Sequence, residues 1–349
     1  METQASPETS RSTTEDSGQE LRSPLGFTGQ TEVNPAWERV HKNSMEFLVR
    51  HNLIQSKEEF DFMNHEQVAW GIGTAYPYCN EETFQLITDW TNHNCLHDDA
   101  VEKIKDPQSV IALAHSCMLA LAGEALPHNA SMFARALAEW RQRAVHIGTP
   151  PWLEHFAQRC DAMSHSFVTE RYLTNSNAKL PLNQYIVLRT DSSPLEAWFD
   201  FADLALGLMA ANLPRHTQLL RHDAVEIALV GNEVRTSKRE QSQGAPRLLR
   251  QSDAGTANLI RAYNAALDRF EQRAALLVGD SALYAHTLAR ALHALSCFER
   301  RANRGLAGPS EAQQAPAPSR TPWGQVRGAA LRASNELFSR HSARCAFGA

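Results

Sequence analysis

A helical pattern that runs almost without interruption from Asn34-Pro35 to about Arg304 is the strongest constraint in this sequence. Apolar residues recur at helical spacing in AWERVHKNSMEFLVRHNLI, while SVIALAHSCMLALAGEAL and EAWFDFADLALGLMAANL are apolar nearly all round, which is typical of buried helices. Only QYIVLR has a β-like composition, and periodicity alone cannot distinguish so short a segment from part of a helix. We therefore expect a single all-α domain over residues 35–305, a helical bundle.

Turn signals divide the pattern into separate helices. They stand at Tyr76-Pro77, Gly148-Thr149-Pro150-Pro151, Leu180-Pro181, Ser193-Pro194 and Leu213-Pro214.

The two ends of the chain differ from this domain. Residues 1–34 are rich in Ser, Thr, Glu, Gln and Gly, so we expect a disordered extension whose removal over residues 1–30 leaves activity nearly unchanged. Residues 306–349 begin with a Pro/Ala/Gln-rich linker, followed by a short amphipathic helix candidate, GQVRGAALRASNELFSR.

Composition excludes several classes of function. A net charge of −5 and a pI near 6.3 give no basic field for nucleic acid or an anionic membrane. No uncharged apolar run approaches the ~18–20 residues of a membrane-spanning helix. The six cysteines are scattered without zinc-ligand spacing, which indicates buried thiols in a reducing compartment. The N-terminus has no apolar stretch of the signal-peptide kind, so we expect a cytoplasmic protein.

The first candidate site is the acidic stretch DWTNHNCLHDDAVEK. On a helix, Asp98 and Glu102 point the same way, with Asp99 beside them. Like charges four residues apart repel each other by a few tenths of a kcal/mol at a surface. A bound metal ion would offset that repulsion, whereas a solvated face or a helix N-cap remains the simpler interpretation of this motif alone.

The second candidate site is LVGNEVRTSKRE, where Asn232, Thr236 and Glu240 are spaced four and four. An amide oxygen, a hydroxyl and a carboxylate are hard ligands that suit Mg²⁺ carrying substrate phosphates. Glu233 could support such a site or face water. Facing the acidic motif across a bundle, this set could hold several Mg²⁺ ions and one diphosphate.

A diphosphate also needs fixed cations, and arginine pairs bidentately with phosphate oxygens. Arg239 precedes Glu240, and Arg189 closes the NQYIVLR segment directly before the break at TDSSP. An arginine at the end of a helix is also a common partner of the helix dipole.

Together these motifs resemble the bacterial class I terpene synthases, from Asn34-Pro35 to about residue 304. NPAWERVHKNSMEFLVRHNLI is similar to the opening helix of that family, and AYPYCNEETFQLITDW to its lead-in to the first metal helix. Asp98, Asp99 and Glu102 occupy the aspartate-rich motif, and Asn232, Thr236 and Glu240 the Asn–Ser/Thr–Glu triad. Arg239 matches the basic residue before the final Glu, Arg189 the diphosphate-sensing arginine, and Ser193 the small effector residue at the helix break.

The resemblance implies a terpenoid-synthase-like bundle around an apolar cavity. It implies a lyase, a Mg²⁺-dependent terpene cyclase with three Mg²⁺ ions, which ionises a linear prenyl diphosphate and cyclises the cation in a dry cavity. Farnesyl diphosphate is the expected substrate, no nucleic acid or membrane is involved, and a homodimer is possible. The segment QSQGAPRLLRQSDAGT is the expected lid. Aromatic residues that could line the cavity are Trp70, Phe84, Trp90, Trp198, Phe199 and Phe201.

The sequence also departs from the family pattern. NHNCLH stands where aromatic residues usually precede the acidic motif, so one cavity wall is expected to be more polar or smaller. SCFERRANRG lacks the tyrosine of the family's Arg-Tyr pair, which leaves Arg301 and Arg304 as alternatives for the last diphosphate contact; we take Arg304. Two other functions stay open at this point: a prenyl-chain-elongating synthase, or a non-catalytic bundle that binds a prenyl diphosphate or a partner.

Overall fold

The computed structural model describes residues 21–27, 32–209, 212–242, 248–249 and 255–304, with the backbone alone for 237–242 and 299–304. Within these ranges the regular elements are helices. The one pairing of β type among the described residues is an isolated bridge between Leu180 and Leu249. The elements are η1 (Pro24–Gly26), α1 (Trp37–Arg50), α2 (Lys57–Glu66), α3 (Val68–Ala75), α4 (Glu81–Lys103), α5 (Pro107–Ala122), α6 (Met132–Ile147), α7 (Pro150–Asn175), α8 (Leu182–Ser192), α9 (Leu195–Leu206), α10 (Arg215–Ser242), α11 (Thr256–Ala274) and α12 (Gly279–Arg304). The predicted all-α class is confirmed.

Local sequence signals fix where these helices begin. The side chains of Ser56, Asn80, Asp106, Ser131 and Thr149 each accept a hydrogen bond from a backbone N–H in the first turn of α2, α4, α5, α6 and α7. Such caps satisfy amide groups that have no partner inside the helix. Each turn signal recognised in the sequence falls at a helix boundary.

The β-like segment QYIVLR lies inside helix α8. Its β-branched residues weaken helix formation only slightly, and packing of α8 against α7 and α10 decides the conformation.

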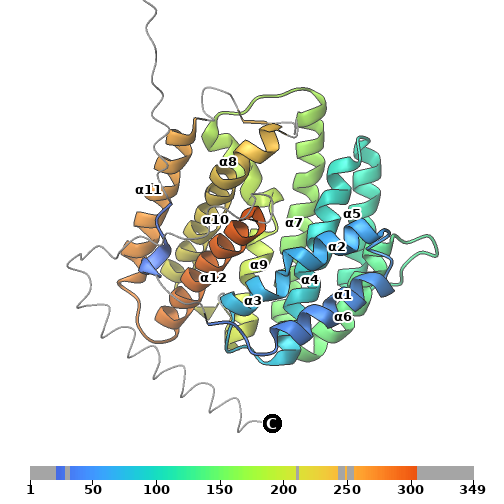
Figure 1. Ribbon diagram of the computed structural model, residues 1–349, viewed down its shortest axis with the longest axis horizontal. Coiled ribbons are helices and arrows are strands. Elements are labelled where there is room, and N and C mark those ends of the chain that lie inside the picture. Colours follow the sequence, from blue (N-terminus) through green and yellow to red (C-terminus); the bar gives the residue numbers. More distant parts are fainter. Residues whose placement is uncertain (1–20, 28–31, 210–211, 243–247, 250–254, 305–349) are drawn as a thin grey trace, which may run out of the picture.

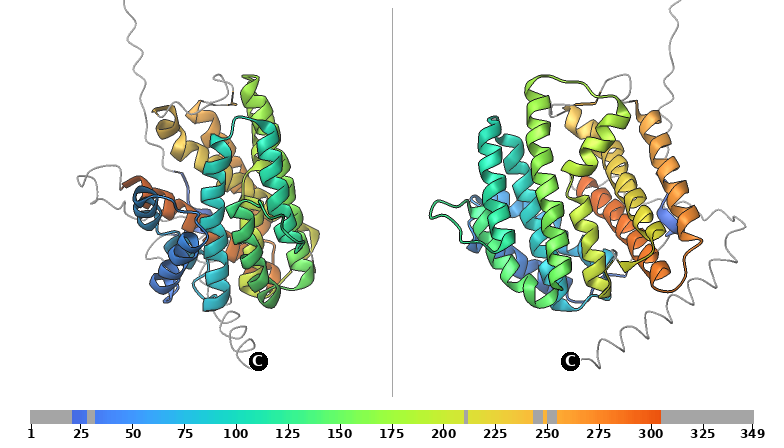
Figure 2. Two further views of the ribbon diagram at one scale, coloured as in Figure 1. Left: turned by 90° about the vertical axis from the view of Figure 1, so that its right-hand side faces the viewer. Right: turned by 180° about the vertical axis from the view of Figure 1, so that it is seen from behind.

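The helices form one bundle in which α7, α8 and α9 lie between two groups of helices, and α3 of one group also packs against α12 of the other (Figures 1 and 2). Helices α1 to α6 lie on one side, and α10, α11 and α12 on the other. Helix α9 contacts both α4 and α10, while α8 contacts both α7 and α10. The C-terminal turns of α4, α7 and α10 lie at the same end of the bundle, at the top of Figure 1.

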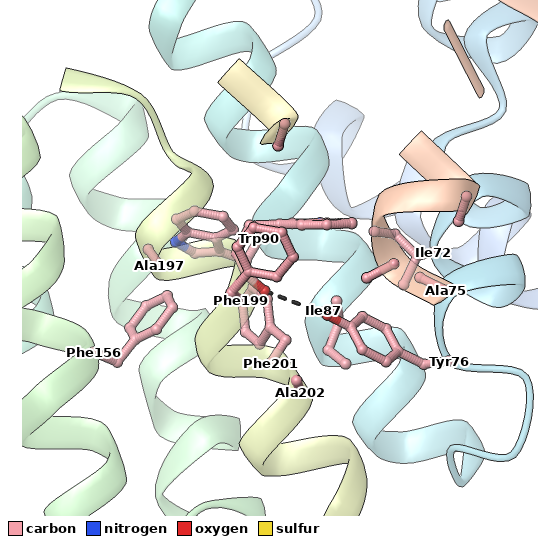
Figure 3. Close-up of a cluster of buried hydrophobic side chains, with 14 of the residues drawn as sticks. Ile72, Ala75, Tyr76, Ile87, Trp90, Phe156, Ala197, Phe199, Phe201 and Ala202 are labelled. Atoms are coloured by element: carbon pink, nitrogen blue, oxygen red, sulfur yellow. Dashed lines mark hydrogen bonds between the residues drawn. The ribbon is translucent and has the colours of Figure 1, made fainter. Parts of the chain in front are cut away.

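Aromatic residues fill the interior between α3, α4, α7 and α9 (Figure 3). The Trp90 ring meets Phe156 and Phe201 edge-on, with ring centroids 5.3 Å apart in both pairs. Of the six aromatic residues expected around a cavity, five are buried in this core, and Trp70 is half-buried. Such edge-to-face clusters give the core a fixed geometry beyond the burial of apolar area.

The prediction that residues 1–34 have no structure is wrong for residues 21–27 and 32–34. Arg22 pairs with Asp268 and Glu271 of α11, at 2.9 Å each. Phe27 stacks on His293 of α12, with ring centroids 5.6 Å apart. The polar composition of residues 1–34 as a whole does not reveal the short apolar cluster around Pro24. This cluster is stabilised by contacts with helices more than 230 residues further along the chain.

None of the described helices is both long and apolar enough to span a membrane.

Candidate active site

The acidic motif occupies the last two turns of α4. Asp98 is half-buried, while Asp99 and Glu102 are exposed. Arg171 of α7 donates hydrogen bonds of 2.9 Å to the backbone oxygens of both Val101 and Glu102. These bonds satisfy carbonyl groups at the C-terminus of α4 and hold the motif against α7.

The carboxyl group of Asp98 faces other charged groups inside the bundle. Enclosure by the protein raises the pKa of Asp98 to about 7; Arg189 of α8 opposes this rise, and Glu102, Glu170 and Asp99 add to it. A carboxylate in this position is stabilised by any further cation placed beside it.

Arg189 lies at the centre of the polar cluster. Its Nη1 donates to both carboxylate oxygens of Glu170 on α7, at 3.0 and 3.2 Å, and lies 3.4 Å from the hydroxyl of Ser192. Its Nε is buried and has no hydrogen-bond partner. Burial by itself would lower the pKa of Arg189, but Glu170, Tyr185 and Asp98 raise it above the usual range, so the guanidinium is charged.

The second candidate set lies in the C-terminal half of α10. Asn232 is half-buried and Thr236 is 7% exposed. The hydroxyl of Thr236 is buried without a hydrogen-bond partner. A buried unpaired hydroxyl costs about 1–3 kcal/mol, so a ligand that binds this oxygen would remove a defect of the ligand-free protein.

Glu233 connects α10 to the same cluster. Its carboxylate accepts a hydrogen bond of 2.5 Å from the hydroxyl of Tyr185, one turn before Arg189 on α8. The sequence left open whether Glu233 supports the site or faces water; it is buried and faces α8.

A continuous set of polar side chains thus joins α4 to α10. Asp98 faces Arg189 and Glu170, and Arg189 lies beside Tyr185, which binds Glu233. Asp98, Arg189 and Glu233 therefore belong to one polar cluster at one end of the bundle, and Asn232 and Thr236 lie on the same turn of α10 as Glu233.

Ser193 ends helix α8 at the break before α9. Its extended backbone (φ −83°, ψ 152°) leaves the helix, its N–H donates to the Arg189 oxygen, and its buried Oγ has no hydrogen-bond partner. The side chains of Arg239, Glu240, Arg301 and Arg304 lie outside the described residues, although their backbone belongs to α10 and α12. Most of the expected lid also lies outside them; its Leu248 oxygen accepts the Leu180 N–H at 2.7 Å.

Two residues of this cluster, Glu170 and Tyr185, were not selected from the sequence. Tyr185 stands four residues before Arg189, so helical spacing could have suggested it. Glu170 stands in FVTERYL on a long helix, where no local pattern marks it.

The histidines of NHNCLH turn away from this cluster. His93 and His97 stack on each other with ring centroids 6.0 Å apart, and both pack edge-on against Phe133 of α6. Burial lowers the pKa of His93 to about 3 and that of His97 to about 4, so both are neutral. They belong to the packing between α4 and α6.

Among the described side chains, no group of three or more His, Cys, Asp or Glu is arranged to hold a metal ion. The α10 set contributes an amide and a hydroxyl, and its carboxylate, Glu240, is outside the described side chains. An open pocket of about 630 Å³ lies elsewhere, between α5, α6 and α7.

The fold and this cluster define an all-α protein in which carboxyl and hydroxyl oxygens and an arginine lie at one end of a helical bundle. Residues 89–281 match the family described as terpene synthase family 2, C-terminal metal binding. The chain therefore belongs to this family and is a class I terpene synthase, a lyase that depends on a divalent metal ion.

Relatives and solved structures agree with this assignment. The chain is 24% identical over 230 residues to a farnesyl-diphosphate-cyclizing 4-epi-cubebol synthase of Streptosporangium roseum, covering 64% of this chain and 69% of the relative. It is 20% identical over 224 residues to a germacrene A synthase of Nostoc punctiforme, covering 62% and 69%. Its fold is similar to that of linalool/nerolidol synthase from Streptomyces clavuligerus, with a TM-score of 0.68 and 16% identity over 78% of this chain and 99% of that one.

Proposed function

We propose that this chain is a Mg²⁺-dependent sesquiterpene cyclase, which ionises farnesyl diphosphate and cyclises the resulting allylic cation. The observation that carries this proposal is the charged Arg189, with a buried, unpaired Nε, between Asp98 on one side and Tyr185, which binds Glu233 of α10, on the other. The choice of farnesyl diphosphate rests on the relative whose name specifies that substrate.

The residues present fit a divalent metal. The buried Thr236 hydroxyl lacks a partner, the Asp98 carboxyl lies enclosed beside other acids, and Asn232 adds an amide oxygen. These hard oxygen donors are the kind that Mg²⁺ prefers. We assign the metal ions, three in number, to Asp98, Asp99 and Glu102 on α4 and to Asn232, Thr236 and Glu240 on α10. Metal ions held by these residues would offset part of the diphosphate charge and so would favour its departure.

The protein's own groups have three tasks in this reaction. Arg189, Arg239 and Arg304 bind the diphosphate oxygens and hold the leaving group after the C–O bond breaks. Ser193 lies at the α8–α9 break, where a backbone group can face the reacting carbon. We assign the apolar wall to residues of the aromatic core of Figure 3, which pack against one another in the described structure. Ring faces stabilise a cation by about 0.5–2 kcal/mol, and an apolar wall excludes water.

The test is incubation of the purified protein with C10, C15 and C20 prenyl diphosphates and Mg²⁺, followed by mass spectrometry of the volatile extract. We expect a cyclic C15 product that disappears when EDTA is added. Longer linear diphosphates formed with added isopentenyl diphosphate would contradict the proposal and favour chain elongation. Diphosphate binding without any hydrocarbon or alcohol would favour a non-catalytic protein.

A further inference from the structure

Glu170 of the neighbouring helix α7 binds both Arg189 and Ser192, the residue at the helix break. It lies near the C-terminus of α7, and its side chain is 19% exposed. Its Oε1 accepts hydrogen bonds from Arg189 Nη1 at 3.0 Å and from the Ser192 hydroxyl at 2.6 Å, and its Oε2 lies 3.2 Å from the same Nη1. One carboxylate from a different helix therefore binds both Arg189 and the last residue of α8.

The contact uses only one nitrogen of the guanidinium. Arg189 has five N–H donors in a rigid plane, and Glu170 engages Nη1 alone. The Nε on the opposite edge is buried and has no hydrogen-bond partner. The edge formed by Nε and Nη2 is one of two that can bind an oxyanion with two parallel hydrogen bonds, and the other includes Nη1, which Glu170 already contacts. Glu170 thus fixes the orientation of Arg189 and leaves its bidentate edge for a ligand.

The same carboxylate links Arg189 to the start of α9. Ser192 is buried and is the last residue of α8, and the next residue, Ser193, has an extended backbone. Arg189 and Ser192 donate to the same oxygen of Glu170, and Nη1 of Arg189 also lies 3.4 Å from the Ser192 hydroxyl, so a displacement of Arg189 toward a bound anion would disturb the contacts of Ser192.

We propose that Glu170 is the positioning residue that presents Arg189 to the substrate diphosphate and couples diphosphate binding to the α8–α9 break. This inference rests on the proposed function for the identity of the anion. The chemistry alone requires a diphosphate-like oxyanion with two oxygens available to one guanidinium.

The test separates binding from turnover with three single variants, to which a double variant and Glu170→Asp are added. Glu170→Gln keeps the shape but removes the charge that orients Arg189. Ser192→Ala keeps the Glu170–Arg189 pair and removes its link to the helix break. Glu154→Gln is the matched control, since Glu154 is an exposed glutamate on the same helix, near its other end. The probe is inorganic pyrophosphate with Mg²⁺, titrated by calorimetry, next to kcat and KM with farnesyl diphosphate.

We expect Glu170→Gln to weaken Mg²⁺–pyrophosphate binding about tenfold and to lower kcat about tenfold or more, because a charge-assisted contact is lost on Arg189. Ser192→Ala should bind pyrophosphate within about twofold of the parent, yet lose about tenfold in kcat. The double variant should have the kcat of Glu170→Gln alone, since both changes interrupt one connection. Glu170→Asp should recover part of the pyrophosphate affinity, and Glu154→Gln should change neither quantity.

Unchanged or tighter pyrophosphate binding by a folded Glu170→Gln would overturn the proposal; tighter binding would mean that Glu170 competes with the ligand. Additive losses in the double variant would overturn the coupling to the helix break. Equal weakening of Mg²⁺ binding without pyrophosphate would make Glu170 a metal ligand and would also overturn it. A parent protein that binds pyrophosphate but makes no terpene refutes the proposed function, while the pyrophosphate comparison still decides the role of Glu170.

Discussion

Thr236→Val should make the ligand-free protein more stable and the enzyme inactive. The Thr236 hydroxyl is buried, with the residue 7% exposed, and has no hydrogen-bond partner. Valine has the same shape and replaces this oxygen with a methyl group, which removes a desolvation cost of about 1–2 kcal/mol. In a domain of this size, a change of 1 kcal/mol shifts Tm by about 2–4 °C. We therefore expect a Tm increase of about 2–8 °C without ligand.

The same substitution removes a proposed metal ligand. Ligand at 100 times its Kd stabilises a protein by about 2.7 kcal/mol, so Mg²⁺ with pyrophosphate should raise the Tm of the parent by several degrees. Thr236→Val should lose most of this increase and at least about a hundredfold in kcat. Differential scanning fluorimetry with and without Mg²⁺ and pyrophosphate measures both effects.

Thr217→Val is the matched control on the same helix. Thr217 is 0% exposed, and its hydroxyl donates to Ser281 at 3.1 Å. Loss of this hydroxyl in Thr217→Val should lower Tm, because the hydrogen bond to Ser281 is removed. The increase of Tm caused by Mg²⁺ and pyrophosphate should remain. A Thr236→Val protein that is less stable than the parent, or that keeps the full pyrophosphate response, would refute the argument.

Three further predictions address other parts of the molecule. Burial holds the pKa of His93 at about 3 in the folded protein, below its unfolded value of about 6.5. The contribution of neutral His93 to the free energy of unfolding is therefore fully present above pH 6.5 and is lost as the pH decreases. Between pH 7 and 5, this one group lowers the free energy of unfolding by about 2 kcal/mol. His93→Phe should therefore show a smaller drop in Tm over that interval than the parent, and an equal drop would exclude His93 as a source. Deleting residues 1–27 should lower the free energy of unfolding by about 2–4 kcal/mol, because the contacts of Arg22 with α11 and of Phe27 with α12 are lost. Deletion of residues 1–20 is the control, and equal Tm values for the two truncated proteins would contradict the packing. Asn232→Ala should abolish turnover at nearly unchanged Tm, measured by product formation and circular dichroism, since Asn232 is only half-buried; normal turnover would remove it from the metal ligands.

Much of the fold could be predicted because its signals are local. Turn signals containing Pro150 and Pro181 predicted helix boundaries that the structure has, and the caps Asn80 and Asp106 are equally local, although they were not selected from the sequence. The N-terminal segment around Pro24 was missed because its apolar residues are few and their partners lie on α11 and α12. Local composition cannot show such a distant partner.

For the candidate site, the sequence determined which residues can share a face, because a helix repeats every ~3.6 residues. Asp98, Asn232 and Thr236 were selected in this way, whereas Arg189 was selected from its place before the helix break and from the family resemblance. Only the tertiary structure decided that Glu170 binds Arg189 and Ser192, that Tyr185 binds Glu233, and that His93 and His97 turn toward Phe133. These contacts depend on how whole helices pack and on which rotamer each side chain adopts. Helical spacing gives the direction in which a side chain points, and packing determines what it meets there.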